Sequence, residues 1–297
     1  MALRVLANAK INWTLDIVGM LPNGYHRLDM LLQSINIADE LHFEESSQLT
    51  LTIDSLSPIT LQNDDENLVL KAANALRCYA DCKNGARIHL KKSIPILAGL
   101  GGGSSDAAAT LVGLNVLWDL QLSSNELTQI GAKLGADIPF CIQGGLQRAE
   151  GFGQLLTPLC QLNPFLLIII KPTTGLSTKD VFARFDTESY ANVRKPNNEK
   201  ASQALKARQF KEFSSCFGNV LESAACSLNQ EVRLAIQDLY EAGAVYAQMT
   251  GSGSAVFGIF DHQRIRQNAF EVLLLKWENC YLAETTNEGI RVIPLDS

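Results

Sequence analysis

A run of small residues near position 100 is the part of the sequence most suited to chemistry. Residues 99–105 are Gly-Leu-Gly-Gly-Gly-Ser-Ser, and a helical pattern follows directly. Glycine has no Cβ, so several backbone N–H groups can surround an anion, and a helix N-terminus adds unpaired donors and about half a positive charge. The hydroxyls of Ser104 and Ser105 can bond phosphate oxygens or a metal ion. These residues predict a phosphate-binding loop.

Other phosphate loops differ from this one at defined positions. A Walker A loop ends in Gly-Lys-Ser/Thr, whereas Ser104, Ser105 and Asp106 follow these glycines without a lysine. A dinucleotide fingerprint needs a third glycine or alanine and then a strand carrying an acid, but position 104 is serine and a second helix follows. A protein-kinase glycine loop lies between two strands and precedes a His-Arg-Asp set. A flexible linker is the remaining alternative, although linkers rarely stand between a strand and an amphipathic helix.

Composition narrows the class of protein. The 297 residues allow one large domain or two of about 150 residues each. A formal net charge of −6 argues against nucleic acid or an anionic membrane as a partner. The longest apolar run, 165–170, is far shorter than the ~20 residues that cross a membrane. Seven scattered cysteines without a C-x-x-C pair are typical of reduced thiols rather than of a zinc site. With no signal or transit peptide visible, we expect a cytoplasmic protein, or one of a plastid-type compartment if a transit peptide has been removed.

The first half of the chain must supply strands and helices around the loop. Alternating apolar residues predict strands, and a Pro-Asn-Gly turn at 22–24 separates the first two. Helical spacing marks 68–79, the segment after the glycines, and a capped helix that starts at Ser123 and stops at Gly135. The expected strands cover residues 5–18, 28–43, 49–53 and 86–91.

The pattern changes near residue 160. A buried strand at 165–170 precedes helical patterns between about 176 and 242, and the polar stretch 186–206 suggests an exposed loop. Two strands around Gly251-Ser-Gly-Ser254, a helix over 262–277 and a last strand near 281–285 complete the chain. Strand, helix, strand, strand, helix, strand is the order of a ferredoxin-like domain.

Two glycine motifs in this order resemble those of the GHMP kinases. Residues 95–109, Pro-Ile-Leu-Ala-Gly-Leu-Gly-Gly-Gly-Ser-Ser-Asp-Ala-Ala-Ala, resemble the ATP loop of that family, and residues 249–257 resemble its C-terminal glycine motif. The resemblance implies an α+β fold of two domains: a ribosomal protein S5 domain 2-like domain over 1–159 and a ferredoxin-like domain over 160–297. It also implies ATP and Mg²⁺ as cofactors.

Further stretches are similar to one branch of this family, which acts on a cytidine-diphosphate substrate. That resemblance implies ATP-dependent phosphorylation of a hydroxyl of 4-diphosphocytidyl-2-C-methyl-D-erythritol, giving the 2-phosphate and ADP in the non-mevalonate isoprenoid pathway. Asn8 and Trp13 depart from the branch, which usually has proline and a smaller aliphatic there, and Trp13 could alter the shape of the pocket. The stretches that carry the resemblance are 9–12, 23–28, 67–68 and 134–140.

Two charged residues are the candidates for catalysis. Asp137 precedes Ile138-Pro139, where an aspartate can act as a general base or simply cap a short helix. Lys10 lies in an expected strand and shares one face of it with Asn12. A lone lysine in a strand usually points outward into solvent. The resemblance implies that Asp137 is the base, that Lys10 stabilises the transferring charge and keeps Asp137 ionised, and that Asn12 orients the substrate.

The resemblance also implies a pocket for the cytosine base. Tyr25 would stack on the base, His26 would bond its edge, and Phe182 would close the other side, with Gly24 and Thr178 nearby. From the residues alone, Tyr25 and His26 could equally be a half-buried aromatic and a histidine in a turn.

The remaining expected contacts belong to the nucleotide and the diphosphate. Lys92 could also end its strand at the surface. Ser105 is a candidate for the metal, and residues 251–253 could line the substrate diphosphate or form a plain hairpin turn. The residues that the resemblance assigns to ATP are Asn67, Leu68, Lys92, Pro95, Ile96, Leu97, Ala98, Gly99, Leu100, Gly101, Gly102, Gly103, Ser104 and Ser105.

Two alternative functions stay open at this point. Another GHMP kinase, of homoserine or mevalonate type, would not need Tyr25, His26 and Phe182. A non-catalytic nucleotide-binding sensor on the same fold would not need both Lys10 and Asp137. No oligomeric state follows from the sequence.

Overall fold

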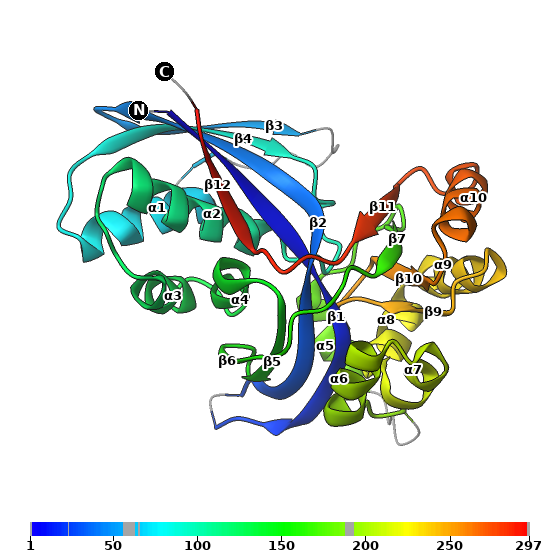
Figure 1. Cartoon of the computed structure of the whole chain (residues 1–297). Helices are drawn as coiled ribbons and strands as arrows, with labels where there is room; N and C mark the ends of the chain where they lie inside the picture. Colours follow the sequence, from blue (N-terminus) through cyan, green and yellow to red (C-terminus); the bar gives the residue numbers. More distant parts are fainter. Residues whose placement is uncertain (1, 23, 56–62, 65, 188–192, 296–297) are drawn as a thin grey trace.

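A computed structural model describes residues 2–295 except 23, 56–62, 65 and 188–192. Asn23 of the expected turn and Asp65, just before the helix expected over 68–79, lie outside these residues. The mixed α and β architecture expected from the sequence is confirmed (Figure 1). Within the described residues, no helix is both long and apolar enough to cross a membrane.

Two long antiparallel strands, β1 (Ala2–Met20) and β2 (His26–Ser46), form the centre of the first sheet. The strand order is β12-β1-β2-β4-β3. In addition, β5 pairs with β2, β6 pairs with β5, and β8 pairs with β1. The pairing register of β1 on β2 shifts between Asn12 and Thr14, just after the face that carries Lys10. The other strands of this sheet are β3 (Leu49–Ser55), β4 (Gly85–Lys92), β5 (Leu146–Gly151), β6 (Leu155–Pro158), β8 (Gly218–Asn219) and β12 (Ile290–Pro294).

Helix α2 (Gly102–Leu117) is the element that the glycine run opens, and it packs against β1, β2 and β12. Its central residues 107–109 are fully buried, because the helix lies between the sheet and α1. A Cβ at Gly113 would lie 2.8 Å from the Phe43 ring, so glycine permits this close approach to β2. The neighbouring helices are α1 (Leu68–Tyr79), α3 (Ser124–Ala132) and α4 (Ile138–Gln143).

The second sheet has the strand order β11-β7-β10-β9, with antiparallel pairing throughout. Helices separate β7 from β9, and α10 separates β10 from β11, which gives the ferredoxin-like order expected from the sequence. The strands are β7 (Leu166–Ile170), β9 (Tyr246–Met249), β10 (Val256–Phe260) and β11 (Cys280–Glu284). The helices are α5 (Thr178–Thr187), α6 (Asn198–Ala207), α7 (Phe210–Cys216), α8 (Glu222–Leu228), α9 (Gln230–Glu241) and α10 (Gln263–Leu274).

The expectation of an exposed loop over 186–206 is wrong for its second half. Residues 198–207 form α6, whose first turn is capped when the Asn197 side chain accepts the N–H of Lys200 at 2.9 Å. Ala201 and Leu205, one turn apart, are fully buried. The buried stripe is narrow, and the polar residues around it hide it in the sequence.

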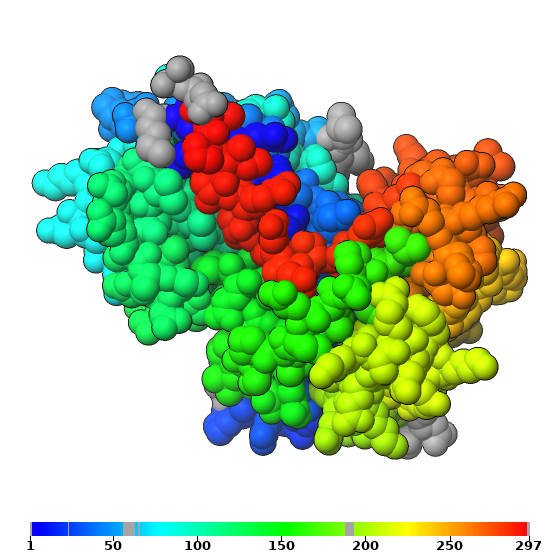
Figure 2. Space-filling model, in the orientation of Figure 1, coloured from blue at the N-terminus to red at the C-terminus, as the bar shows by residue number. Residues whose placement is uncertain are grey.

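The end of the chain returns to the first sheet. Strand β12 pairs antiparallel with the start of β1, and Figure 2 shows the red C-terminal segment running across this face of the molecule. Residues 290–294 therefore belong to the N-terminal sheet. For the rest of the chain, the domain boundary near residue 160 stays a prediction.

The two sheets also share a core through Trp13 of β1. Its ring centroid lies 5.6 Å from that of Phe165 and 5.5 Å from that of Phe257. Trp13 is fully buried and does not line the cavity described below, so it does not shape the pocket directly as the sequence suggested.

Candidate active site

A cavity of about 1050 Å³ lies where β1, the glycine loop and the start of α5 meet. This volume is at the upper end of the range of ligand-binding pockets. The structure brings together on its walls the site residues predicted from the sequence, except Ser105 and Gly253. These are Lys10, Asn12, Gly24, Tyr25, His26, Asn67, Leu68, Lys92, residues 95–104, Asp137, Thr178 and Phe182.

The two glycine motifs pack directly against each other in the wall of the cavity. Gly99 has φ +74°, and a Cβ there would lie 2.4 Å from the carbonyl oxygen of Thr250. The N–H of Ala255 donates to the carbonyl of Ala98 at 3.1 Å, and the N–H of Lys10 donates to the carbonyl of Leu100 at 2.9 Å. Three segments far apart in the sequence are thus joined through their backbones.

The N-terminus of α2 faces the cavity. Gly101, at φ +74°, occupies the N-cap position and has no side chain with which to cap the helix. Gly102, Gly103 and Ser104 of the first turn line the cavity. Backbone donors at a helix N-terminus favour an anion, so this wall suits the phosphates of a nucleotide.

Lys10 and Asp137 approach each other on the cavity wall. The Nζ of Lys10 lies 3.9 Å from Oδ2 of Asp137 and donates to Oδ1 of Asn12 at 2.8 Å. Thr250 fixes Asn12 in turn, since its Oγ1 accepts the backbone N–H of Asn12 at 3.0 Å. Asp137 occupies the N-cap position of α4, but its side chain makes no capping hydrogen bond there. A capping role therefore does not explain this carboxylate, which is free to face a ligand.

Aromatic side chains gather at the other end of the cavity. The His26 ring centroid lies 4.8 Å from that of Phe182, and Nε2 of His26 lies 2.8 Å from Oδ1 of Asp186. Tyr25 is 64% exposed, with its ring centroid 6.2 Å from that of Phe152. Phe152 also lines the cavity and was missed at the level of sequence, because nothing near Gly151 and Gly153 marks it as part of a site.

A hydrogen bond between two hydroxyl groups joins α5 to the C-terminal glycine motif in the cavity wall. Oγ1 of Thr178, at the start of α5, lies 2.8 Å from Oγ of Ser252 in the C-terminal glycine motif. Gly251 and Ser252 line the cavity. A Cβ at Gly251 would lie 3.2 Å from the Nζ of Lys10, so the second glycine motif leaves room for that lysine.

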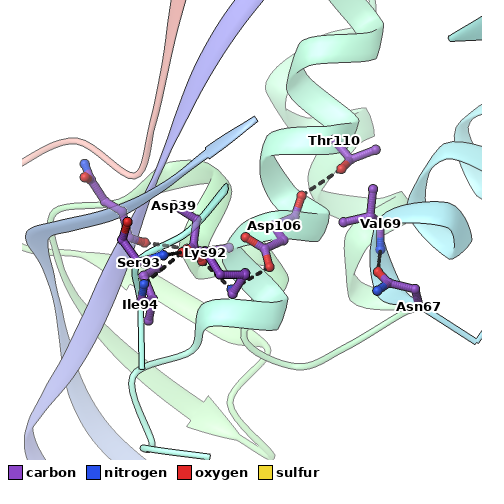
Figure 3. A network of polar contacts seen from close by, with 10 residues as sticks. Asp39, Asn67, Val69, Lys92, Ser93, Ile94, Asp106 and Thr110 are labelled. Carbon is purple, nitrogen blue, oxygen red and sulfur yellow. Dashed lines mark hydrogen bonds and ion pairs between the residues drawn. The ribbon is translucent and has the colours of Figure 1, made fainter. Parts of the chain in front are cut away.

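Lys92 is buried, and the alternative that it ends its strand at the surface is wrong. Its side chain is 5% exposed and donates to Oδ2 of Asp39 and, at 2.7 Å, to Oδ2 of Asp106 (Figure 3). Burial raises the pKa of Asp106 well above its usual value, although Lys92 opposes this shift. Burial works to lower the pKa of Lys92, but Asp106 and Asp39 together raise it. Asp106 stands directly after the serines of the loop and could have been noticed, whereas nothing in the sequence marks Asp39.

Ser105 is not placed for the role expected of it. Its hydroxyl donates to the carbonyl oxygen of Asn8, and its N–H donates to the carbonyl of Gly101 at 2.9 Å. The residue is fully buried and does not line the cavity. The second serine of the loop turns inward because it lies on the face of α2 that packs on β1, so its hydroxyl does not face a metal ion or a phosphate in the cavity.

Comparison with known proteins agrees with this geometry. Residues 67–145 match the family model described as GHMP kinases N terminal domain, and residues 201–279 match GHMP kinases C terminal. The chain is 36% identical to a 4-diphosphocytidyl-2-C-methyl-D-erythritol kinase of Clostridioides difficile (strain 630), over 98% of this chain and 97% of the relative.

Solved structures give the same result. A crystal structure of 4-(cytidine 5'-diphospho)-2C-methyl-D-erythritol kinase is similar with a TM-score of 0.78 and 30% identity, over 95% of this chain and 98% of that one. A homoserine kinase from Cytophaga hutchinsonii has a TM-score of 0.76 at 18% identity, over 98% of this chain and 97% of that one, which shows a common fold alone.

Proposed function

The chain belongs to the GHMP kinase family, as its glycine motifs predicted, and from this premise we propose that it transfers the terminal phosphoryl group of ATP to 4-diphosphocytidyl-2-C-methyl-D-erythritol. The acceptor is the hydroxyl that yields the 2-phosphate, and the second product is ADP. The single observation that carries the proposal is the meeting of Lys10 and Asp137 between the anion-binding loop and the aromatic end of one cavity.

Asp137 is the proposed general base. As the substrate oxygen bonds to the γ-phosphorus, its proton passes to the Asp137 carboxylate, and the bond from phosphorus to the β,γ-bridging oxygen breaks with its electron pair left on ADP. The Asp137 side chain is 34% exposed toward the cavity, which allows a hydroxyl to reach it.

Lys10 is the proposed electrostatic partner of this step. Its ammonium is held by Asn12 and is nearly excluded from solvent, with a side chain 6% exposed. A fixed positive charge in a site of low polarity stabilises negative charge that develops on the transferring group. Asn12, held by Thr250, positions this ammonium and can also contact the substrate.

The proposed nucleotide site uses the glycine loop and the N-terminus of α2 for the phosphates. Asn67 and Leu68 at the start of α1 and Lys92 at the end of β4 line the same end of the cavity, where the nucleoside is expected. The Asn67 side chain accepts the N–H of Val69 at 2.9 Å, so it also caps α1. Because the chain has a net charge of −6, its overall charge does not attract a triphosphate, and the backbone donors of the loop supply most of the binding of this anion.

Mg²⁺ is implied by the family, and the residues present fit an ion held mainly by the nucleotide. Among the described residues, no group of three or more His, Cys, Asp or Glu side chains could hold a metal. Asp106 lines the cavity beside the loop, and its buried Oδ1 has no hydrogen-bond partner in the part of the chain that the structure describes. One carboxylate with phosphates and waters is a usual set for Mg²⁺, which would neutralise phosphate charge there.

The proposed cytosine site lies at the aromatic end of the cavity. Tyr25 and Phe182 offer ring faces to a base, and His26 offers Nδ1 to its edge, since Nε2 already faces Asp186. Because both substrates are water-soluble phosphorylated compounds, we also place the reaction in the cytoplasm.

Release of ADP tests this function. We expect the purified chain to form one ADP for each molecule of 4-diphosphocytidyl-2-C-methyl-D-erythritol phosphorylated, and chelation of Mg²⁺ with EDTA to stop the reaction. Nucleotide binding with no ADP release at any concentration of this acceptor would contradict the proposal and favour a non-catalytic sensor.

A further inference from the structure

Asp39 belongs to a buried polar network with Ser93, Ile94 and Lys92 (Figure 3). The residue is fully buried in β2, yet it does not line the cavity. Its Oδ1 accepts the N–H of Ser93 at 2.6 Å and that of Ile94 at 2.8 Å, while its Oδ2 accepts from the ammonium of Lys92. One carboxylate therefore satisfies two backbone donors and one charged donor.

These contacts fix both ends of the glycine loop. Ser93 and Ile94 begin the segment that leads into the loop, so Asp39 holds its entrance. Lys92 holds its exit, because the same ammonium that bonds Asp39 also bonds Asp106 on α2. A Cβ at Gly102, the first residue of α2, would lie 3.2 Å from the Nζ of Lys92, so this ammonium lies close to the backbone at the end of the loop.

The contacts in the network distinguish Asp39 from Asp106. Two carboxylates share the Lys92 ammonium. Asp39 accepts from three donors, two of which are the backbone N–H groups at the entrance of the loop, whereas Asp106 of α2 accepts from Lys92. Asp39 is therefore the carboxylate that joins Lys92 to the backbone of the loop.

We propose that Asp39 is a positioning residue for the nucleotide, which holds Lys92 and the backbone of residues 93–94 so that both ends of the glycine loop keep the geometry that binds ATP. The inference rests on the proposed function only in placing a nucleotide at this loop. Asp39 acts through its neighbours and touches neither substrate.

The variant Asp39→Asn tests this role with little change of shape. Its amide oxygen can still accept the N–H groups of Ser93 and Ile94, but the charge facing Lys92 is lost. We expect the dissociation constant of a non-hydrolysable ATP analogue, measured by calorimetry, to rise at least tenfold, and that of the cytidylyl substrate to change less than twofold.

The ion pair of Glu44 with Arg87 supplies a matched control. It joins the same two strands, β2 and β4, at 2.8 Å, but both side chains are more than half exposed. Glu44→Gln should leave both dissociation constants unchanged. A purely structural role of Asp39 would weaken both ligands together or neither, so the split between the two ligands is the diagnostic readout.

Several results would overturn the inference. One is a folded Asp39→Asn protein with the wild-type affinity for the ATP analogue, and another is an equal loss of affinity for both ligands. If Asp39→Asn does not fold, Lys92→Met should show the same selective loss, and an unchanged nucleotide affinity there would refute the role. A wild-type chain that binds the cytidylyl substrate but no nucleotide would overturn the proposed function, and this inference with it.

Discussion

At the scale of single residues, the site depends on two charged side chains, Lys10 and Asp137, that do not form a close ion pair with each other. Lys10 is nearly buried, bonds the neutral Asn12 amide at 2.8 Å and stays 3.9 Å from Asp137. In a closer ion pair the two charges would mainly interact with each other. The 3.9 Å spacing leaves room for a hydroxyl or a phosphate oxygen beside the Lys10 ammonium or the Asp137 carboxylate. Lys92, by contrast, forms ion pairs with two carboxylates, Asp39 and Asp106.

Asp137→Asn removes the proposed base but keeps its shape. We expect kcat to fall by about 10²–10⁴, because general base catalysis typically contributes that much. The dissociation constant of ATP should change little, since the loop is untouched. Steady-state kinetics with separate nucleotide titrations measure both quantities, and a variant that keeps near wild-type turnover would refute the assignment.

Tyr25→Ala tests the cytosine pocket. Loss of stacking costs about 1–3 kcal/mol per base, so KM for the cytidylyl substrate should rise by about 5- to 150-fold with a smaller effect on kcat. Tyr79→Ala is the control, because Tyr79 is also exposed but lies at the far end of α1 and bonds Glu126. Equal KM values for Tyr25→Ala and wild type would argue against the pocket.

At the scale of elements, two glycine loops and one strand form the centre of the site through backbone contacts. Gly99 meets Thr250, Ala98 bonds Ala255, and Leu100 bonds Lys10. The relative position of Lys10 and the phosphate loop is therefore set by backbone hydrogen bonds and not by the packing of side chains.

Gly99→Ala should break this contact. The added Cβ would lie 2.4 Å from a backbone oxygen at φ +74°, so the two loops must separate. We expect the free energy of unfolding to fall by about 1–3 kcal/mol and activity to be largely lost. Gly103→Ala is the stability control, because its Cβ would meet only Leu68 at an ordinary 3.5 Å. Equal melting temperatures for Gly99→Ala and wild type would contradict this account of the loops.

Glu40 links three strands of the first sheet and predicts how its stability depends on pH. It bonds Arg4 of β1, its neighbour His42 on β2, and Lys91 of β4. Burial would raise the pKa of Glu40, but the hydrogen bonds from His42 and Arg4 outweigh it and lower the pKa from 4.5 to about 2. A lowered pKa means that the ionised form stabilises the folded state above pH 4.5, and that this stability is lost as the pH falls toward 2.

Glu40→Gln should therefore be less stable than wild type by about 1 kcal/mol at pH 7, a small value because the partners are partly exposed. The difference should shrink between pH 4.5 and pH 2 in urea unfolding measured at a series of pH values. A difference that stays constant across this range would show that the charge of Glu40 is not responsible.

At the scale of the whole molecule, the walls of the cavity come from the first sheet with its glycine loop and, in the second half of the chain, from α5 and residues 251–252. The chain passes between these two parts more than once. The long β1 carries Lys10 toward the second sheet, and β12 brings the end of the chain back to the first. Residues at position 10 and position 252 can therefore line one cavity.

Much of this arrangement follows from local patterns in the sequence. Side chains alternate along a strand, so Lys10 and Asn12 had to share a face, and Ala9 and Ile11 indeed enter the core. The glycines predicted the loop because few other residues allow such backbone geometry. The apolar runs predicted the order in which strands and helices of the second sheet follow each other along the chain.

Contacts between distant residues could not be predicted in this way. Asp39 and Lys92 are 53 residues apart, and no local pattern links them. Ser105 and Ser104 look equivalent in sequence, but the turn of α2 sends one to Asn8 and the other to the cavity. The buried stripe of α6 is only three residues wide, Ala201, Ala204 and Leu205, and its polar surroundings conceal it.

The central claim is that this chain phosphorylates a cytidylyl methylerythritol in preference to the other alcohols of its family. The most direct test compares kcat/KM for ADP release with 4-diphosphocytidyl-2-C-methyl-D-erythritol, homoserine, mevalonate and galactose under identical ATP and Mg²⁺. We predict turnover with the cytidylyl substrate and at least a thousandfold lower kcat/KM with each of the others. Turnover of homoserine or mevalonate at a comparable or higher kcat/KM would contradict the claim.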